Sequence, residues 1–255
     1  GLTYIEVEEG NTNYRSSGNC LISGTTLKLG CGTSVIPNDG SIAYIDEDAF
    51  YECASLKSIV VPGSVIKIKY AAFSYCTGLT SVTIEKGVRE IGYEAYYGCK
   101  SLTEIIIPNT VTSIDESFSY CANLTSIEVE EGNTVYHSSG NCLIETESKE
   151  LIIGCNTSII PTDGSVTIIS SYAFSGRLGL TEITIPNSVT SIYWYAFSGC
   201  KSLASVTFEN TTGWYIASSS TATSGTSVDV TNTNANLIDW LTKTYGYYDK
   251  FWKCT

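Results

Sequence analysis

Hydrophobic positions recur along this chain with a period of 22 or 23 residues. The first core residue of each repeat, here called the leader, is usually leucine. The leaders are Leu2, Cys31, Leu56, Leu79, Leu102, Leu124, Cys155, Leu180 and Leu203. Further apolar residues follow a regular leader after five, nine and twelve residues, as Val61, Val65 and Ile68 follow Leu56. This periodicity predicts a solenoid, because one repeat is too short to enclose a core and must share it with its neighbours.

The second half of each repeat carries small and aromatic residues at fixed positions. After Leu56 these are Ala72 and Phe73, with Cys76 three residues further on, and the same slots recur in the other regular repeats. Another slot, six residues after the leader, holds every proline of the chain: Pro37, Pro62, Pro108, Pro161 and Pro186. Proline has no N–H group to give to a strand ladder, so we predict that a strand ends at this slot.

Two of the repeats are longer than the others and resemble each other closely. Residues 2–22 recur 122 residues later as 124–144, which makes a repeat of repeats. With these included, the sequence predicts about nine turns of 22–31 residues. Turns stacked about 4.8 Å apart would form a β-rich coil on the order of 40 Å long.

The repeat pattern stops at Phe208, and a segment rich in Thr, Ser and Asn follows. Beyond it, four apolar residues are spaced as on one face of a helix: Leu237, Trp240, Leu241 and Tyr245. Because the end of a solenoid needs a cover, we predict a repeat domain at 1–207 and a small capping segment with a helix at 208–255. Trp240 and Leu241 should be buried against the turn led by Leu203.

The repeated motif L-x-x-I-x-I-P-x-x-V-x-x-I-x-x-x-A-F-x-x-C resembles the BspA-type leucine-rich repeats of bacterial and protist surface proteins. The resemblance covers roughly 1–210, and the Trp- and Tyr-rich tail is similar to the family's usual C-terminal ending. It implies a curved leucine-rich-repeat solenoid with a surface binding or adhesion role. Four positions depart from the motif. Arg177 replaces the cysteine, Tyr96 replaces the phenylalanine, and Glu85 and Glu130 replace the proline.

The negative net charge of the chain excludes some classes of binding partner. Its net charge is −12 with only 14 basic residues, and no run of Lys or Arg appears, which argues against nucleic acid and against anionic membrane surfaces. No apolar run approaches the roughly 20 residues that cross a bilayer, so no membrane insertion is expected of this fragment. The resemblance and the high Ser, Thr, Tyr and Asn content favour an extracellular or cell-surface location, with the targeting segment outside this chain.

Ten cysteines invite a disulfide or zinc interpretation, but most of them occupy repeat slots. Stacked parallel side chains keep their Cβ atoms near 4.8 Å apart, above the usual 3.5–4.5 Å of a disulfide. No Cys-x-x-Cys pair or His/Cys cluster has the spacing of a zinc site. We therefore predict buried, reduced thiols, and we expect Cys254, which lies outside the repeat pattern, to be the most reactive one.

Catalytic chemistry has little support in the sequence. His137 is the only histidine, and its counterpart in the first long repeat is Arg15, so it is interpreted as a loop residue rather than a general base. Clustered acids such as Glu128, Glu130 and Glu131 follow the repeat without the spacing of a calcium loop, which favours a solvated face. We therefore expect no enzyme activity, no cofactor and no metal.

Two surfaces qualify as candidate binding surfaces. Outward-pointing strand residues form a hydroxyl-rich, mildly acidic strip that includes Glu104, Glu128 and Glu182. Aromatic residues two or three positions before the ladder aromatic form a flank, and their rings suit protein or sugar contacts. The flank residues are Tyr70, Tyr93, Tyr172, Trp194 and Tyr195. We expect the flank to supply affinity and the strip to supply orientation, unless the rings only cover the side of the stack.

The sequence leaves three functions open. The first is a non-enzymatic cell-surface or secreted binding module that adheres to an extracellular protein of a host or neighbouring cell. The second is a carbohydrate-binding solenoid that uses the Tyr/Trp flank. The third is a structural spacer or stalk that displays another domain.

Overall fold

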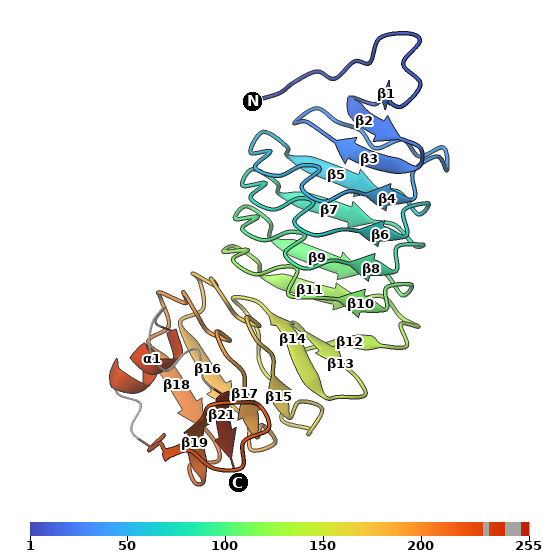
Figure 1. Cartoon of the computed structure of the whole chain (residues 1–255). Coiled ribbons are helices and arrows are strands. Elements are labelled where there is room, and N and C mark those ends of the chain that lie inside the picture. The colour runs from blue at the N-terminus through green and yellow to red at the C-terminus, as the bar shows by residue number, and fades with distance from the viewer. Residues whose placement is uncertain (232–234, 243–250, 255) are drawn as a thin grey trace. The chain divides into compact units, whose positions relative to one another are not determined.

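The computed structural model describes residues 1–231, 235–242 and 251–254 of the chain. It divides into two compact units. The first unit holds Gly1–Leu124 and Val129–Thr134, and the second holds Thr125–Glu128 and Val135–Thr255. Strand β11 (Ser126–Val129) lies at the division. Figure 1 shows strands stacked as successive rungs in each unit, which is a β-solenoid.

The first unit contains two kinds of rung. A seven-stranded sheet runs in the order β1-β2-β3-β4-β6-β8-β10, antiparallel over its first three strands and parallel from β3 onward. Its strands are β1 (Arg15–Ser17), β2 (Cys20–Ser23), β3 (Thr26–Leu29), β4 (Tyr44–Ile45), β6 (Lys67–Ile68), β8 (Glu90–Ile91) and β10 (Ser113–Ile114). Longer strands between these short ones form the other face: β5 (Ser58–Val61), β7 (Ser81–Ile84) and β9 (Glu104–Ile107).

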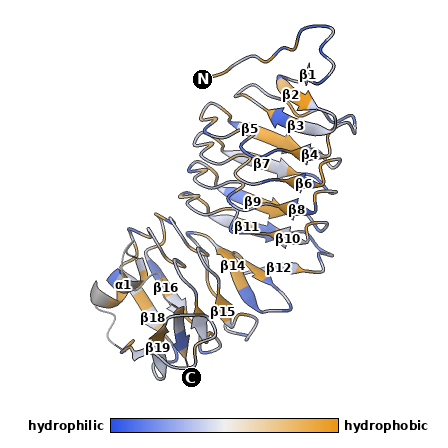
Figure 2. Cartoon of the chain, in the orientation of Figure 1, coloured by the Kyte–Doolittle hydropathy of each residue, from blue (hydrophilic) through white to orange (hydrophobic). Residues whose placement is uncertain are grey.

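Paired residues on adjacent strands are separated by one repeat length in the sequence. Ser58 in β5 pairs with Ser81 in β7, and Val61 pairs with Ile84, each 23 residues further along. In β5 the residues alternate between exposed and buried, which places Ile59 and Val61 in the core. Figure 2 shows the apolar stretches of such strands. Pro62 follows β5 directly, so the strand ends where the proline slot predicted.

The second unit repeats this plan and adds the C-terminal segment. Among its described residues, one sheet runs in the order β12-β13-β14-β15-β17-β21-β19-β20. These strands are β12 (Tyr136–Ser139), β13 (Cys142–Glu145), β14 (Glu150–Gly154), β15 (Ile168–Ile169), β17 (Ser191–Ile192), β19 (Trp214–Ala217), β20 (Thr226–Ser227) and β21 (Phe251–Cys254). A second, parallel pair consists of β16 (Glu182–Ile185) and β18 (Ser205–Phe208). Helix α1 spans Ala235–Thr242.

The turn count differs slightly from the sequence prediction, with about seven turns instead of nine. The difference lies in the two long repeats, where the chain forms the antiparallel hairpins β1–β2 and β12–β13. Gly18 and Asn19 both have positive φ (57° and 56°), and so do Gly140 and Asn141 (56° and 56°). Two consecutive residues of this kind form the tight turn that matches the twist of a hairpin. Leu2, expected in the core as a leader, is 50% exposed.

An aromatic ladder runs through the core of each unit. In the first unit, ring centroids lie 4.8 Å apart for Phe50–Phe73, 5.1 Å for Phe73–Tyr96 and 5.0 Å for Tyr96–Phe118. Such ring pairs contribute about 0.5–1.5 kcal/mol beyond the area that they bury. Each ladder begins against a glycine. A Cβ atom on Gly30 would lie 1.9 Å from the Phe50 ring, and one on Gly154 would lie 2.0 Å from the Phe174 ring.

A file of thiols accompanies the rings. Each Sγ atom donates to the carbonyl oxygen of the ladder aromatic one turn earlier, at 3.1 Å for Cys76, 3.2 Å for Cys99 and Cys121, and 2.9 Å for Cys200. In the same slot, the fully buried Arg177 donates from Nε to Gly154 O at 2.7 Å. The thiols therefore serve as small core residues that also satisfy a backbone acceptor.

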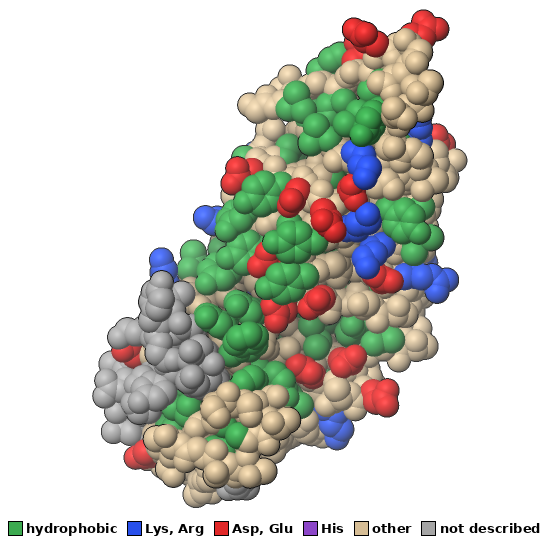
Figure 3. All heavy atoms as spheres, in the orientation of Figure 1, with side chains coloured by type: hydrophobic (Ala, Val, Ile, Leu, Met, Phe, Trp, Pro, Cys, Tyr) green, Lys and Arg blue, Asp and Glu red, His purple; other side chains and the backbone are tan. Residues whose placement is uncertain are grey.

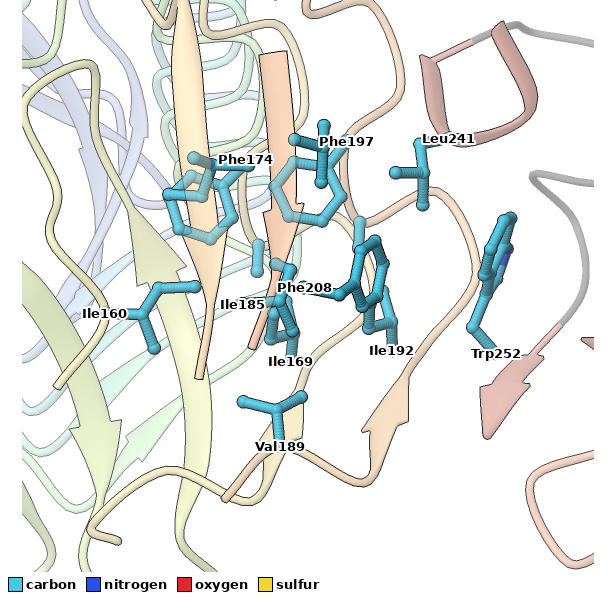
Figure 4. Close-up of a cluster of buried hydrophobic side chains, with 14 of the residues drawn as sticks. Ile160, Ile169, Phe174, Ile185, Val189, Ile192, Phe197, Phe208, Leu241 and Trp252 are labelled. Carbon is cyan, nitrogen blue, oxygen red and sulfur yellow. The ribbon is translucent and has the colours of Figure 1, made fainter. Parts of the chain in front are cut away.

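The C-terminal segment shares the core of the second unit. Trp214, Leu241 and Trp252 are buried in the cluster that also contains Leu203 and Phe197. Figure 4 shows Leu241 and Trp252 beyond Phe197, where the next rung of the aromatic ladder would lie. The Trp240 side chain and Tyr245 fall outside the described residues. The domain boundary at 208 stays a prediction, and Phe208 itself is the last residue of β18.

Helix α1 has eight residues. Over the described ranges, no helix combines the length and apolar character that a bilayer crossing needs.

Replacing Tyr96 by phenylalanine should raise the free energy of unfolding by about 1 kcal/mol. The Tyr96 hydroxyl is buried without a hydrogen-bond partner, whereas the ring stacks on both neighbours and would remain. Urea unfolding of the two proteins measures the difference. Tyr97→Phe is the matched control, because the Tyr97 side chain is only half-buried. A variant of Tyr96 that is less stable than the parent would show that the hydroxyl has a stabilising partner.

The ten thiols should be reduced and mostly shielded. Burial raises the pKa of Cys20 and Cys200 to about 11 and of Cys76 and Cys142 to about 12, so little thiolate is present at neutral pH. Titration with a thiol reagent should detect few thiols in the native protein, Cys53 and Cys254 first because they are half-buried. Nearly all ten should react after denaturation without a reductant. Detection of fewer than about half would mean that the cysteines are cross-linked.

Candidate binding surface

The aromatic flank of the first unit is a pair of stacked tyrosines. Tyr70 follows β6 and Tyr93 follows β8, each three residues before a ladder aromatic, so the register of the strands brings them one rung apart. Their ring centroids are 6.0 Å apart with an interplanar angle of 5°. Tyr70 is 46% exposed and Tyr93 is 38% exposed. Two of the predicted flank residues therefore form one continuous surface.

A groove of about 440 Å³ lies along this pair. Besides the two rings, its lining includes Tyr44, Glu47, Lys67 and Asp115. Figure 3 shows hydrophobic side chains and carboxylates interleaved on the visible face, with a group of basic side chains beside them to the right. The groove thus combines aromatic area with charged groups of both signs.

The lysines of this region already have partners. Lys67 Nζ lies 2.6 Å from Glu90 Oε2, while Lys28 and Lys69 bind the two oxygens of Asp46 at 2.6 Å and 2.7 Å. Burial opposes ionisation of Asp46, but the hydrogen bonds from both lysines prevail and lower its pKa. Exposed ion pairs contribute little to stability, about 0–1 kcal/mol. Their effect here is to neutralise the lysines of the groove.

The carboxylates beside the rings are crowded. The Tyr70 hydroxyl donates to Glu94 Oε2 at 3.4 Å. Burial, followed by the negative charges of Asp115 and Glu94, raises the pKa of Glu116 to about 7, against a small opposite effect of its hydrogen bond with Tyr93. Asp115 and Glu94 disfavour the ionised form of Glu116 because they carry the same charge. Negative charge therefore accumulates beside the two rings.

A second file of tyrosines lies next to the cysteine slot of the same unit, one or two residues before each cysteine in the sequence. Ring centroids lie 5.8 Å apart for Tyr51–Tyr75, 5.2 Å for Tyr75–Tyr97 and 5.2 Å for Tyr97–Tyr120. Tyr75 and Tyr120 stand directly before repeat cysteines and belong to the aromatic surface that the sequence suggests, whereas Tyr51 and Tyr97 were not predicted. The position of the four tyrosines shifts between one and two residues before the cysteine, so no fixed slot in the sequence reveals the whole file.

The flank of the second unit is aromatic without carboxylates. Tyr172 and Tyr195 stack with centroids 4.9 Å apart, and Trp194, 43% exposed, lies 5.8 Å from Tyr195. Ser171 takes the slot that Trp194 holds one turn later. The structure therefore brings the predicted flank residues together within each unit.

The predicted acidic strip is exposed as expected from strand alternation. Glu104 in β9, Glu128 in β11 and Glu182 in β16 all point outward. Glu182 also lines a hollow of about 410 Å³ with Ile159 and strand hydroxyls of β16 and β18. Ile159 is 75% exposed, and the sequence analysis did not single it out. A signal was present, because Val35 fills the same slot of the first long repeat and is 69% exposed.

The remaining candidates have ordinary structural surroundings. His137 lies in hairpin strand β12, where Nδ1 and Thr146 Oγ1 are 2.9 Å apart. Cys254 belongs to β21, where its Sγ donates to Thr212 O at 3.2 Å, and burial raises its pKa. Over the residues that the structure describes, no three His, Cys, Asp or Glu side chains are grouped to hold a metal ion.

The rungs, the aromatic ladder and the cysteine slot define a solenoid of the leucine-rich-repeat class. The sequence pattern of the BspA type leucine rich repeat region matches in six copies, over 43–164 and 148–238. These ranges cover more than half of the chain, so the chain belongs to this family. No curated protein matches it.

Solved structures share the fold at low identity. A leucine-rich repeat protein from Eubacterium ventriosum is 20% identical with a TM-score of 0.51, over 78% of this chain and 70% of that one. The pneumococcal vaccine antigen PcpA is 17% identical with a TM-score of 0.57, over 81% of this chain. This chain covers 63% of that antigen, which is less than two thirds of its length. At these identities the likeness shows the fold alone.

Replacing Glu116 by glutamine should make stability less dependent on pH. The folded protein holds the proton more tightly than the unfolded chain, since the pKa is raised from 4.5 to about 7. The stabilisation that protonation provides is therefore complete below about pH 4.5 and is lost as the pH rises through about 7. At pH 8 the variant should be more stable than the parent by about 1 kcal/mol, a value reduced for the solvent screening of a half-buried group.

Urea unfolding at pH 4.5 and pH 8 measures this effect, with Glu104→Gln on the exposed strip of the same unit as the control. An equal gain at both pH values, or an equal gain in the control, would mean that the raised pKa of Glu116 is not its cause.

Proposed function

We propose that this chain is a non-enzymatic binding module that presents its aromatic flank to an extracellular protein. The observation that carries the proposal is the exposed, stacked pair Tyr70–Tyr93 along a groove. Large, stiff aromatic side chains are enriched among residues that dominate binding energy. The two rings are exposed rather than part of the core, and the stacking of the rungs holds them side by side at the surface. Membership of the BspA-type family supports a cell-surface or extracellular setting for such a module.

The acidic strip complements this role. Glu104, Glu128 and Glu182 are exposed, and charges at the rim of an interface affect association rate and orientation more than affinity. The proposal of a non-enzymatic role is supported by the repeat pattern, because the counterpart of His137, the only histidine in the sequence, is Arg15 in the first long repeat.

A glycan is the second candidate ligand. It is favoured by the same groove, because tyrosine rings next to carboxylates and hydroxyls can stack on a sugar and bind its hydroxyl groups. Screening the full chain against extracellular-matrix and mucosal proteins and against a glycan array separates the two. Binding to glycans alone would replace the protein partner by a carbohydrate, and binding to neither would favour a spacer.

Replacing Tyr70 and Tyr93 together by alanine should weaken binding of a captured extracellular protein by about 30-fold or more, which corresponds to about 2 kcal/mol. The rings would supply the apolar area of the contact. Biolayer interferometry measures the affinity, and unchanged thermal unfolding confirms that the variant is folded. The triple variant Glu104→Gln, Glu128→Gln and Glu182→Gln should mainly slow association. The assignment fails if the aromatic variant is folded and binds like the parent while the acidic variant loses binding.

A further inference from the structure

In the groove of the first unit, a carboxylate flanks each end of the stack of two rings. Glu47, Tyr70, Tyr93 and Asp115 all stand three residues before a ladder aromatic on four successive turns. All four line the groove. Equivalent positions of adjacent rungs are about 4.8 Å apart, so each carboxylate stands one rung beyond the outer face of a ring. The order along the file is carboxylate, ring, ring, carboxylate.

A second file, made of three acidic residues and one alanine, runs beside the first. The next residue on each turn is Asp48, Ala71, Glu94 and Glu116, and all four have positive φ, between 42° and 55°. This backbone conformation is costly for residues other than glycine, and it recurs at the same position on each rung. The hydroxyls of Tyr70 and Tyr93 hydrogen-bond to Glu94 and Glu116 respectively, and the two rings stack on each other.

Negative charge is in excess along these two files. The ion pairs of the first unit join Lys28 and Lys69 to Asp46, Lys67 to Glu90, and Lys86 to Glu130. None of them uses a carboxylate of the two files. Burial, and then the negative charges of Asp115 and Glu94, raise the pKa of Glu116 to about 7. A cation that entered the groove would relieve this repulsion.

We propose that the groove binds arginine side chains of an extended segment of the extracellular protein partner. A guanidinium group would stack on the outer face of Tyr93 while it pairs with Asp115, and a second could do the same between Tyr70 and Glu47. This inference rests on the proposed function and names the chemistry of the partner. Arginine fits better than lysine, because its planar ion stacks on a ring and forms two parallel hydrogen bonds to a carboxylate.

The second unit provides a contrast inside the same chain. Its corresponding files hold Ser171 and Trp194, and Tyr172 and Tyr195, with no carboxylate among them. These aromatic residues offer ring area without a partner for the cation. The structure therefore assigns arginine recognition to the flank of the first unit.

The test uses the full chain and three labelled peptides of the same spacing, Gly-Arg-Gly-Arg-Gly and its lysine and citrulline counterparts, with fluorescence anisotropy at low and physiological salt. The arginine peptide should bind at least about tenfold more tightly than the lysine peptide, and the citrulline peptide, which lacks the charge, should bind least. Asp115→Asn should weaken arginine binding about tenfold, a double-hydrogen-bonded ion pair being lost. Tyr93→Leu should weaken it similarly, whereas Tyr93→Phe should keep the ring face and the binding.

The matched controls are Glu9→Gln, which removes one negative charge from the same unit, and Tyr4→Leu, which removes an exposed ring outside the groove. Both should bind the arginine peptide like the parent. Equal affinity for arginine and lysine, full binding by a folded Asp115→Asn variant, or an equal loss in Glu9→Gln would overturn the inference. If an extracellular protein binds the chain but the arginine peptide does not, only this inference fails; if no extracellular protein binds, the proposed function fails whatever the peptide does.

Discussion

The structure depends on one constraint, which is that each rung must repeat the one before it in register. Backbone pairing such as Ser58 with Ser81 fixes the spacing of adjacent turns, and every side chain then meets its own equivalent about 4.8 Å away. Aromatic rings tolerate this arrangement well, as the Phe50–Phe73 stack at 4.8 Å shows. The cysteines tolerate it because each thiol donates to a carbonyl of the previous turn rather than to another thiol. Residues that stack favourably on themselves therefore fill the core slots.

Each aromatic ladder needs a first ring with nothing stacked before it, and a glycine makes room for that ring in both units. Gly30 and Gly154 lie where a further ring would stand, and each leaves room for the ring of the next turn, Phe50 or Phe174, to pack against its backbone. Both glycines end the third strand of an antiparallel meander or follow it directly. The long repeat is thus a module that starts a new ladder, and its two copies correspond to the two compact units of the chain. In the second unit, Leu241 and Trp252 take over where the rings stop.

The sequence alone was sufficient for the architecture because period and register are the same quantity. The offset between Leu56 and Leu79 equals the offset between paired residues of β5 and β7. The hairpins of the long repeats were missed, although Gly18-Asn19 between two strands is a local signal of a tight turn. For the site, the slots predicted that Tyr70 and Tyr93 share a face. They did not predict the groove or the crowding at Glu116, because both depend on the depth and side-chain partners of surface loops.

The same constraint that builds the core makes charged slots difficult. Like charges on adjacent rungs repel, so a solenoid must either alternate their sign or neutralise them from a neighbouring slot. The chain alternates the sign at two places, with Lys67 opposite Glu90 and with Asp46 between Lys28 and Lys69. At Glu94, Asp115 and Glu116 it does neither, and part of the cost appears as the raised pKa of Glu116. An unrelieved repulsion beside two exposed rings is reasonable for a surface that is completed by a cationic partner, and it has no use in a surface that only covers the stack.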